Sequence, residues 1–435
     1  MKRLFQDSVK RHGLSMLLVL FGMGSLWLVD SLVGFSTVMF NSSFIPPDST
    51  TYIEAADMLY NDFAPHHLRP LGYAFLLGLP NLFIEMDTHD YVIWSTVLNA
   101  LAWLLMLLLC FKTLEHWFNR SVFPFILTCA LFILFSYYGF IFLVLTEIFT
   151  ALGLVAAVYL FSRSSKTQNS GYFLTGVSLL VFLVLIRPGL FYLAILAVLY
   201  AFIRYRGQAL RNVWLSSALL LLVVQCTWMK MTYGNFKPSY IDSVTWYLYT
   251  GAQIEAEITG QNTADVAAAR HKEMHFMLNK ERARLSSEDL KSKELEHPSL
   301  VYKWIMKNHG ENVHGGSYPY NGVKLNHPSA QQRDRAEVLL QATLQQNRNS
   351  QKFIFWLTLI SLLFIRKLTI PLLFCAGTVW YISGTSSISF WQGDRFHMIF
   401  YPLLWIWTIL LIRTITPRIV ELKTRFLSFR KRVRS

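Results

Sequence analysis

Apolar runs long enough to cross a membrane recur through most of this chain, and they limit its possible folds more than any other feature. A membrane-spanning helix needs roughly 20 consecutive apolar residues. The composition agrees, because 53% of the 435 residues are hydrophobic and only 15% are charged. A soluble protein carries about 25% charged residues. A membrane β-barrel is excluded, because its strands alternate apolar and polar residues and these runs do not. The sequence therefore predicts an all-α polytopic membrane protein.

We expect about ten transmembrane helices, interfacial helices in the first outer loop and a small, mostly helical extracytoplasmic region. The predicted spans are residues 14–33, 91–111, two within 122–161, 172–186, one ending before 204, 213–230, 353–365, 368–386 and 396–412. The predicted domains are an N-terminal transmembrane module (1–230, with a first outer loop at about 34–90), an extracytoplasmic loop domain (231–351), C-terminal transmembrane helices (352–412) and a basic cytoplasmic tail (413–435).

Positive charge sets the expected orientation. The formal net charge is +14, and much of the excess lies at the termini and in short loops on one side of the predicted membrane. This distribution follows the positive-inside rule, so it predicts cytoplasmic termini and does not indicate a nucleic-acid partner. The tail would contact anionic membrane lipids. Short loops favour a bacterial inner membrane as the location. The basic residues of the tail are Lys423, Arg425, Arg430, Lys431, Arg432 and Arg434.

The first outer loop is rich in acids where it follows the first span. Tyr52, Ala55, Ala56, Leu59 and Tyr60 recur at helical spacing, which predicts an amphipathic surface helix with its acids on another face. This helix would begin just after position 49 or 50, with Ser or Thr as its N-cap. The apolar stretch 71–84 is too short to span, so we interpret it as re-entrant or interfacial. A solvated loop that simply re-enters the bilayer explains the same residues.

Few basic residues remain on the predicted outer side apart from the large loop. Arg69, Arg187 and Arg395 each lie at a membrane boundary, where lipid phosphates are found. A guanidinium there can bind phosphate bidentately, although arginines near helix ends also commonly snorkel toward water. Glu147 is the only acid in the double span, and an acid at that depth is costly without a partner. A structural ion pair with one of the arginines explains Glu147 equally well.

Several short motifs follow one another in a suggestive order. They are Asp48-Ser49 with Tyr52 and Ala55, Arg69-Pro70-Leu71-Gly72-Tyr73, Leu145-Thr146-Glu147, Ile186-Arg187-Pro188, Arg395-Phe396-His397 and Tyr401-Pro402-Leu403. Their order and spacing over residues 1–205 and the last span resemble the GT-C superfamily of polyprenyl-phosphate-dependent glycosyltransferases. The resemblance is to its protein O-mannosyltransferase and lipid A aminoarabinose transferase branch. Residues 231–351 match no part of that pattern.

The resemblance implies roles for these residues. Asp48 corresponds to the catalytic base, although the second acid of the family's acidic pair is replaced by Ser49. Arg187 and Arg395, with Arg69 or His397, would bind the donor phosphate, and Glu147 would orient an arginine or contact the sugar. The other implied substrate-binding residues are Tyr52, His66, His67 and Tyr73. The implied partners are a polyprenyl-phosphate sugar donor and a lipid, glycan or protein acceptor. Some members need a divalent metal such as Mg or Mn and others do not, so no cofactor is assigned.

Two other functions fit the composition. An O-antigen polymerase or ligase also has many spans and a large outer loop with arginines. A flippase or transporter would be expected to carry charges near the bilayer midplane, whereas the charges here collect at one face. One further motif, His271-x-x-x-His275, could bind zinc from a helix face, but an exposed polar helix explains it too.

Overall fold

The computed structural model describes residues 2–40, 45–118, 121–389 and 392–434, and it describes side chains from residue 12 to residue 417 of that set. Every regular secondary-structure element in the described part of the chain is a helix, and no β-strand occurs there. The all-α class predicted from the sequence is therefore confirmed.

Five helices in the described residues are long and apolar enough to cross a membrane. They are α1 (Lys2–Val33), α5 (Thr88–Phe118), α8 (Glu147–Thr167), α10 (Phe191–Arg211, preceded by η3, Pro188–Leu190) and α11 (Val213–Tyr233). Shorter apolar helices are α4 (Leu71–Gly78) with η1 (Leu79–Leu82), α6 (Val122–Cys129) with η2 (Ala130–Ile133), and α9 (Ser170–Val184).

The remaining helices lie in the segments between those apolar helices and in the C-terminal part of the chain. They are α2 (Phe35–Met39), α3 (Pro47–Asn61), α7 (Ser136–Phe140), α12 (Ile241–Thr245), the π-helical η4 (Trp246–Thr250), α13 (Gly251–Thr259), α14 (Thr263–His275), α15 (Asn279–Glu296), α16 (Pro298–His314), α17 (Tyr318–Asn326), α18 (Ala330–Leu363), η5 (Ile365–Lys367), α19 (Ile370–Thr385), η6 (Ser386–Ile388) and α20 (Tyr401–Arg434).

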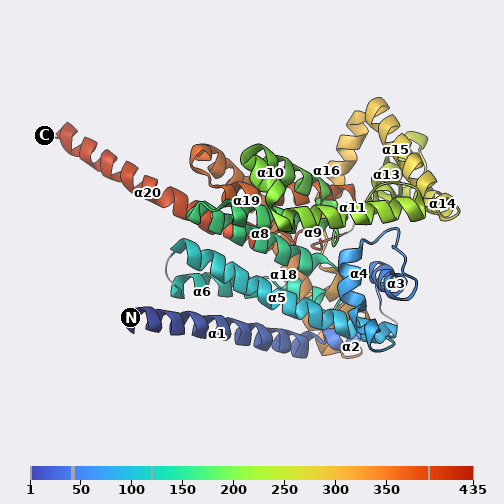
Figure 1. Ribbon diagram of the computed structural model, residues 1–435, viewed down its shortest axis with the longest axis horizontal. Helices are drawn as coiled ribbons and strands as arrows, with labels where there is room; N and C mark the ends of the chain where they lie inside the picture. The colour runs from blue at the N-terminus through green and yellow to red at the C-terminus, as the bar shows by residue number, and fades with distance from the viewer. Residues whose placement is uncertain (1, 41–44, 119–120, 390–391, 435) are drawn as a thin grey trace.

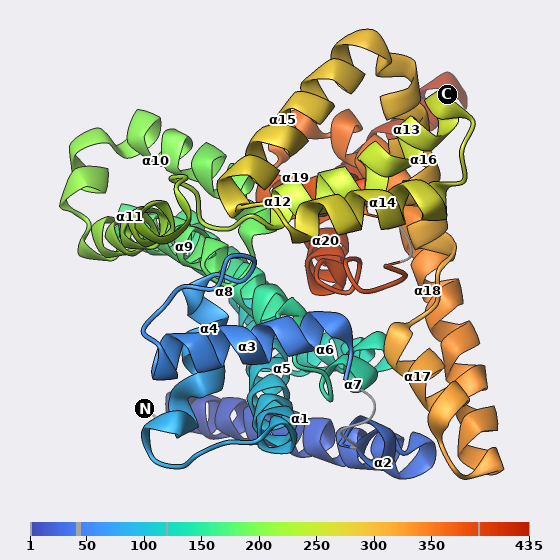
Figure 2. The same cartoon turned by 90° about the vertical axis from the view of Figure 1, so that its right-hand side faces the viewer.

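The long helices run side by side along the longest axis of the molecule (Figure 1). Both termini lie at one end, and the helices α3, α4 and α13 to α15 lie at the other. Figure 2 looks onto this second end, where the loop that leads into α20 lies between α3 and the segment α12 to α14. The long helices thus lead to an end of the molecule where these other helices lie.

Helix α8 lies at the centre of the bundle, in contact with α5, α9 and α19. In the most apolar 18-residue stretch of α8, 61% of the residues are buried, against 17% in the corresponding stretch of η3 and α10. Gly153 lets α8 approach α9 closely, because a Cβ at this position would lie 2.5 Å from the Leu183 side chain. On α10, by contrast, Tyr192, Leu196 and Ile203 are exposed. An apolar outer surface of this kind suits a lipid environment.

The helix predicted for the first outer loop forms, but it begins earlier than predicted. Helix α3 starts at Pro47 instead of after position 49 or 50, because a proline suits the first helical position and its missing N–H costs no hydrogen bond there. Tyr52, Ala55 and Ala56 are buried, as their spacing predicts. The short apolar stretch after it forms α4 and η1.

Three boundaries differ from those expected. In the apolar stretch 122–161, where two spans were expected, α6, η2 and α7 lead through an irregular segment to the start of α8. Helix α18 runs without interruption across position 351, where the loop domain was expected to end. Helix α20 begins at Tyr401, so residues 395–397 lie in the preceding loop rather than in the last span. Side chains of the basic tail beyond residue 417 lie outside the described residues.

Gly72 offers a test of how tightly α4 is docked. Its N–H donates to the Leu185 carbonyl at 2.8 Å, and a Cβ there would lie 2.7 Å from the same oxygen. Because backbone cannot easily move away, Gly72→Ala is expected to lower the free energy of unfolding by about 1–3 kcal/mol. Gly189→Ala is the matched control, since a Cβ at Gly189 meets nothing within 4 Å. Thermal unfolding in detergent measures both, and equal Tm values for the two variants would contradict the close contact.

Candidate functional site

Two acids of the candidate site each lie in the first turn of a helix. Asp48 lies in the first turn of α3, and Glu147 is the first residue of α8. The N-terminus of a helix carries partial positive charge, which stabilises a carboxylate there. The side chain of Asp48 is 41% exposed, whereas that of Glu147 is fully buried. One acid is therefore reachable from solvent and the other is enclosed by protein.

Arg69 and Arg187 lie on two loops that are joined to each other. The N–H of Arg69 donates to Nδ1 of His66 at 3.2 Å, which fixes the loop between α3 and α4. Arg187 follows the end of α9, and its N–H donates to the Leu183 carbonyl at 2.8 Å. The Gly72 hydrogen bond to Leu185 connects these two loops. The backbone thus places both guanidinium groups beside the first turns of α3 and α8.

Arg395 comes from a loop that polar contacts hold from several sides. The N–H of Gln392 donates to Oδ1 of Asn312 at 2.9 Å, and the hydroxyl of Ser136 donates to the buried Asp394 carboxylate. Gly393 has a φ of 55° and packs directly on the backbone of 315–316. A side chain at Gly393 would clash there, so this glycine is needed for both its conformation and its close approach. These contacts fix the position of the loop before α20, which carries Arg395.

The five charged side chains form one cluster. Arg395 joins the two acids, because its Nε donates to Oε1 of Glu147 at 2.5 Å and its Nη1 donates to Asp48. Arg69 donates from Nη2 to the other oxygen of Asp48 at 2.5 Å. Arg187 donates from Nη1 to Oε1 of Glu147 at 3.0 Å. The cluster unites residues that lie up to 347 positions apart in the chain.

Hydroxyls and aromatic rings complete the surroundings of the arginines. Arg69 donates from Nε to the Thr51 hydroxyl at 2.7 Å, and its guanidinium lies 4.2 Å from the centre of the Tyr52 ring. The hydroxyls of Tyr52 and Thr146 are 3.2 Å apart. The guanidinium of Arg187 lies 4.8 Å from the centre of the Phe396 ring, a cation–π distance. These contacts fix the guanidinium planes.

The charge of the cluster does not cancel. Three guanidinium groups face two carboxylates, which leaves one unit of positive charge at this end of the molecule. The Arg395 guanidinium holds the pKa of Asp48 well below its usual range, with Arg69 adding to the effect and burial opposing it. Oε2 of Glu147 is buried with no hydrogen-bond partner among the described residues. The excess of one positive charge, and not this unpaired acceptor oxygen, would suit one further anion at the cluster.

Three other predicted site residues, Tyr73, His66 and His67, lie outside the cluster of charged side chains. The Tyr73 ring meets that of Tyr52 edge-on at 5.3 Å, but its hydroxyl pairs with Ser95 at 2.9 Å. His66 is buried in the loop that carries Arg69. Burial lowers the pKa of His66 to about 3, so it is neutral and accepts hydrogen bonds from backbone N–H groups of that loop. His67 faces a separate pocket described below.

His397 does not join the cluster, although it lies two positions after Arg395. Its Nδ1 pairs with Oδ1 of Asn347, and its ring contacts His309 and Phe400. It is fully buried, and burial together with His309 lowers its pKa to about 3. His397 is thus a neutral, enclosed side chain, and we do not assign the donor phosphate to it.

Sequence reasoning gave no site role to four residues near the cluster. Thr51 lies one helical turn after Asp48, and this spacing could have indicated it. Phe396 adjoins Arg395 in the chain. Tyr249 and Tyr318 come from the 231–351 region, where no periodic pattern indicated them. Burial raises the pKa of both phenols, and the charges of Asp48 and Arg395 also act on them.

A divalent metal fits this cluster poorly. Asp48 and Glu147 are the two acids that a metal would bridge, and the Arg395 guanidinium already lies between them with a hydrogen bond to each. A cation there would meet three positive side chains. Nor do the described residues contain another group of three His, Cys, Asp or Glu side chains arranged to hold a metal ion. No chemical step is therefore assigned to Mg or Mn.

No protein-family model matches the chain, and no curated protein matches it either. The chemistry of the cluster is therefore the ground for assigning a function.

Proposed function

We propose that this protein is a glycosyltransferase that moves a sugar from a polyprenyl-phosphate donor to an acceptor at the outer face of a membrane. The observation that carries the proposal is the five-residue cluster of Asp48, Arg69, Glu147, Arg187 and Arg395. Its net positive charge suits a lipid-linked phosphate, and its half-exposed acid suits an acceptor hydroxyl. Position adds support, because the cluster joins the first turn of α8, a candidate membrane span, to the first turn of α3.

The arginines would act on the leaving group. In the reaction, the bond between the anomeric carbon and the phosphate oxygen breaks, and a bond from the acceptor oxygen to that carbon forms with inversion. The departing phosphate carries both electrons of the broken bond and is stabilised by cations that are already oriented. Arg395 and Arg69 are the arginines nearest Asp48, and Arg187 is tied to Glu147.

Asp48 would take the proton of the acceptor hydroxyl. While both arginines are bound to it, its pKa is too low for an effective base. A donor phosphate competes for the same guanidinium groups, and drawing them away raises the pKa of Asp48. Donor binding would in this way prepare the base for the acceptor. Glu147, with Arg395 and Arg187 on one oxygen, would keep the arginines in place throughout.

The finer topology forms part of the same proposal. Ten spans would arise if α6 with η2, α9, the second half of α18, α19 and α20 cross the bilayer together with the five long apolar helices. Both termini lie at the end of the molecule opposite α3 and α4 (Figure 1), and Asp48 of the cluster lies in the first turn of α3. This arrangement suits cytoplasmic termini and a site facing the periplasm or exterior. A bacterial inner membrane is the proposed location.

Asp48→Asn is expected to lower glycosyl transfer by roughly 10²–10⁴-fold, the usual range for loss of a general base. The measurement is release of labelled product and free lipid phosphate by purified protein from radiolabelled polyprenyl-phosphate sugars. Asp62→Asn is the matched control, because Asp62 is an exposed acid that follows the last residue of the same helix. Equal transfer by wild type and Asp48→Asn would remove Asp48 as the base. Product chains that lengthen with time would indicate a polymerase, and donor binding without any turnover by the wild type would count against a transferase and favour a flippase.

A further inference from the structure

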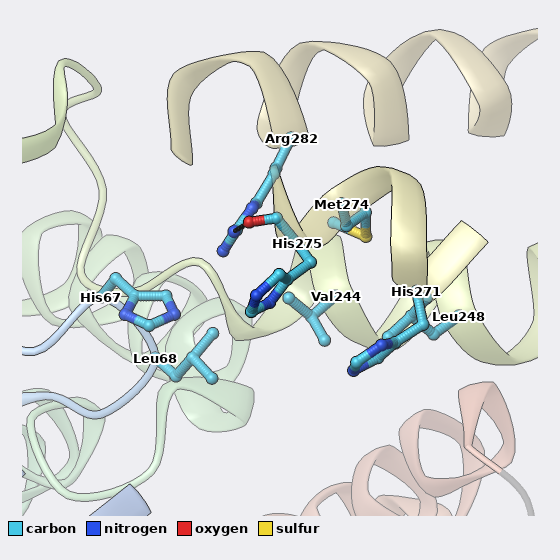
Figure 3. A pocket seen from close by; sticks show the side chains of 8 residues that line it. All are labelled: His67, Leu68, Val244, Leu248, His271, Met274, His275 and Arg282. Carbon is cyan, nitrogen blue, oxygen red and sulfur yellow. Dashed lines mark hydrogen bonds between the residues drawn. The ribbon is translucent and has the colours of Figure 1, made fainter. Parts of the chain in front are cut away.

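A pocket lies beside the 66–70 loop, which also carries Arg69 of the charge cluster. Eight residues line it, four of them basic or imidazole side chains and four of them apolar (Figure 3). The list is His67, Leu68, Val244, Leu248, His271, Met274, His275 and Arg282. They come from the first outer loop, from α12 and η4, from α14 and from α15. No acid is among the lining residues.

Arg282 lacks the counter-charge that a neighbouring arginine has. Arg270 pairs with Asp289 at 2.9 Å and with Glu255 at 3.3 Å, so it serves the local fold. Within the described residues Arg282 makes no ion pair, and its hydrogen bonds go to Oδ1 of Asn279 and the His275 carbonyl. Its Nε is buried and has no partner there. A buried donor left unpaired has lost its hydration without replacement, and a bound oxyanion would restore the missing hydrogen bond.

The nearby acids on α14 and α15 are engaged elsewhere. The Glu273 carboxylate accepts from the Tyr247 hydroxyl at 2.8 Å, and that of Glu281 accepts from the Leu278 N–H at 3.2 Å. Figure 3 shows Arg282 extending toward the rings of His67 and His275, with His271 farther along α14. An arginine among the lining residues disfavours the zinc ion that His271 and His275 suggested, because it repels a cation.

We propose that this pocket binds a phosphate monoester, distinct from the donor phosphate at the charge cluster. Arg282 would supply charge-assisted hydrogen bonds, and the histidines would supply imidazole N–H donors. Leu68, Val244 and Leu248 would contact the apolar or sugar part that carries the phosphate. Nearby, Tyr233 ends the candidate span α11 and its ring contacts His67 at 6.1 Å, so the pocket lies near headgroup level.

The shared loop suggests which substrate would lie there. His67 and Leu68 line the pocket, and the next residue, Arg69, belongs to the cluster. The Ser239 hydroxyl donates to the Leu68 carbonyl at 2.7 Å and the Tyr240 N–H donates to the His67 carbonyl at 2.9 Å, so the 231–351 region holds this loop. A phosphate-bearing acceptor bound here would lie beside Asp48, an assignment that rests on the proposed function.

Binding of phosphate compounds to the full-length protein in detergent tests the pocket without any turnover. Two probes are titrated: inorganic phosphate and a short-chain phosphatidic acid. Each probe can bind at the charge cluster and in this pocket. Arg282→Gln is expected to weaken binding in the pocket at least about tenfold. Arg284→Gln is the matched control, because Arg284 lies on the same helix, is exposed and pairs with Glu288. His275→Gln gives a second variant that leaves the arginine in place, and it is expected to weaken the same site.

The outcomes separate the sources of phosphate and the two proposals. Weaker binding of both probes in Arg282→Gln supports a site for the phosphate group itself, and weaker binding of phosphatidic acid alone supports a lipid headgroup. Unchanged binding of both probes in Arg282→Gln and His275→Gln, or equal weakening in Arg284→Gln, would overturn the inference. Because transfer is not measured, a failure here leaves the proposed reaction at Asp48 standing, and a failure of that reaction leaves this result intact.

Discussion

Glu147→Gln is expected to destabilise the folded protein by about 3–5 kcal/mol, the usual cost of removing one partner from a buried ion pair. Glu147 is fully buried, and its Oε1 accepts from Arg395 at 2.5 Å and from Arg187 at 3.0 Å. Glutamine keeps nearly the same shape and an oxygen acceptor, so the change is mainly one of charge. Two guanidinium groups would then face a neutral amide in an enclosed site. Thermal unfolding of the purified protein in detergent measures the loss.

A double variant separates charge from shape. Glu147→Gln raises the excess positive charge of the cluster, and adding Arg187→Gln returns it to the original value. The double variant is therefore expected to be more stable than the sum of the two single changes predicts, with a coupling energy of about 0.5–3 kcal/mol. Strictly additive effects, or a Glu147→Gln protein as stable as the wild type, would show that this ion pair does not hold the cluster together.

The elements that sequence predicts well are those with a local periodic signal. The buried face of α3 follows from the spacing of Tyr52, Ala55 and Ala56, because residues three and four apart share a helix face. The predicted start of that helix is wrong by a few residues. The preference of Ser and Thr for the N-cap suggested positions 49 or 50, but Pro47 already fits the first helical position.

The charged members of the site could be singled out from sequence, but their pairing could not. Arg69, Arg187 and Arg395 stand out because few other basic residues lie at the predicted outer boundary. That Arg395 contacts both acids depends on how its loop packs on 315–316 and Asn312. Contacts across hundreds of residues leave no local pattern, so the sequence left a structural ion pair at Glu147 as an open alternative.

The errors at the site have the same origin. His397 adjoins Arg395 in the chain, but the turns of the loop send its side chain to Asn347. Sequence proximity in an irregular segment does not fix the direction of a side chain, as it does in a helix. Tyr249 and Tyr318 lie on η4 and α17, and the tertiary packing of these helices brings them close enough for the charges of Asp48 and Arg395 to act on them. Residues brought in by such folding cannot be read from spacing alone.

Arg395→Lys is expected to lower kcat for transfer by about 10²–10³-fold, the usual cost of losing one oriented donor to a developing negative charge. Arginine reaches both acids at once, with Nε on Glu147 and Nη1 on Asp48. Lysine keeps the positive charge but presents it as a single ammonium without the planar fork. The departing phosphate would lose a donor whose position is fixed, whereas the net charge that attracts the donor is unchanged. The effect should therefore fall on kcat more than on KM.

Arg187→Lys provides the comparison at the neighbouring arginine. Arg187 donates to the cluster through Nη1 alone, at 3.0 Å to Glu147 and 3.5 Å to the Thr146 hydroxyl. A lysine ammonium can replace a single donor, so Arg187→Lys is expected to retain within about tenfold of wild-type kcat, a loss of at most ~1.4 kcal/mol in transition-state stabilisation. Steady-state kinetics with a labelled polyprenyl-phosphate sugar gives kcat and KM for each protein. If both lysine variants lost the same fraction of kcat, the bridging geometry of Arg395 would carry no special weight, and total positive charge alone would explain the site. A larger loss at Arg395 would instead identify the arginine between the two acids as the group that meets the leaving phosphate.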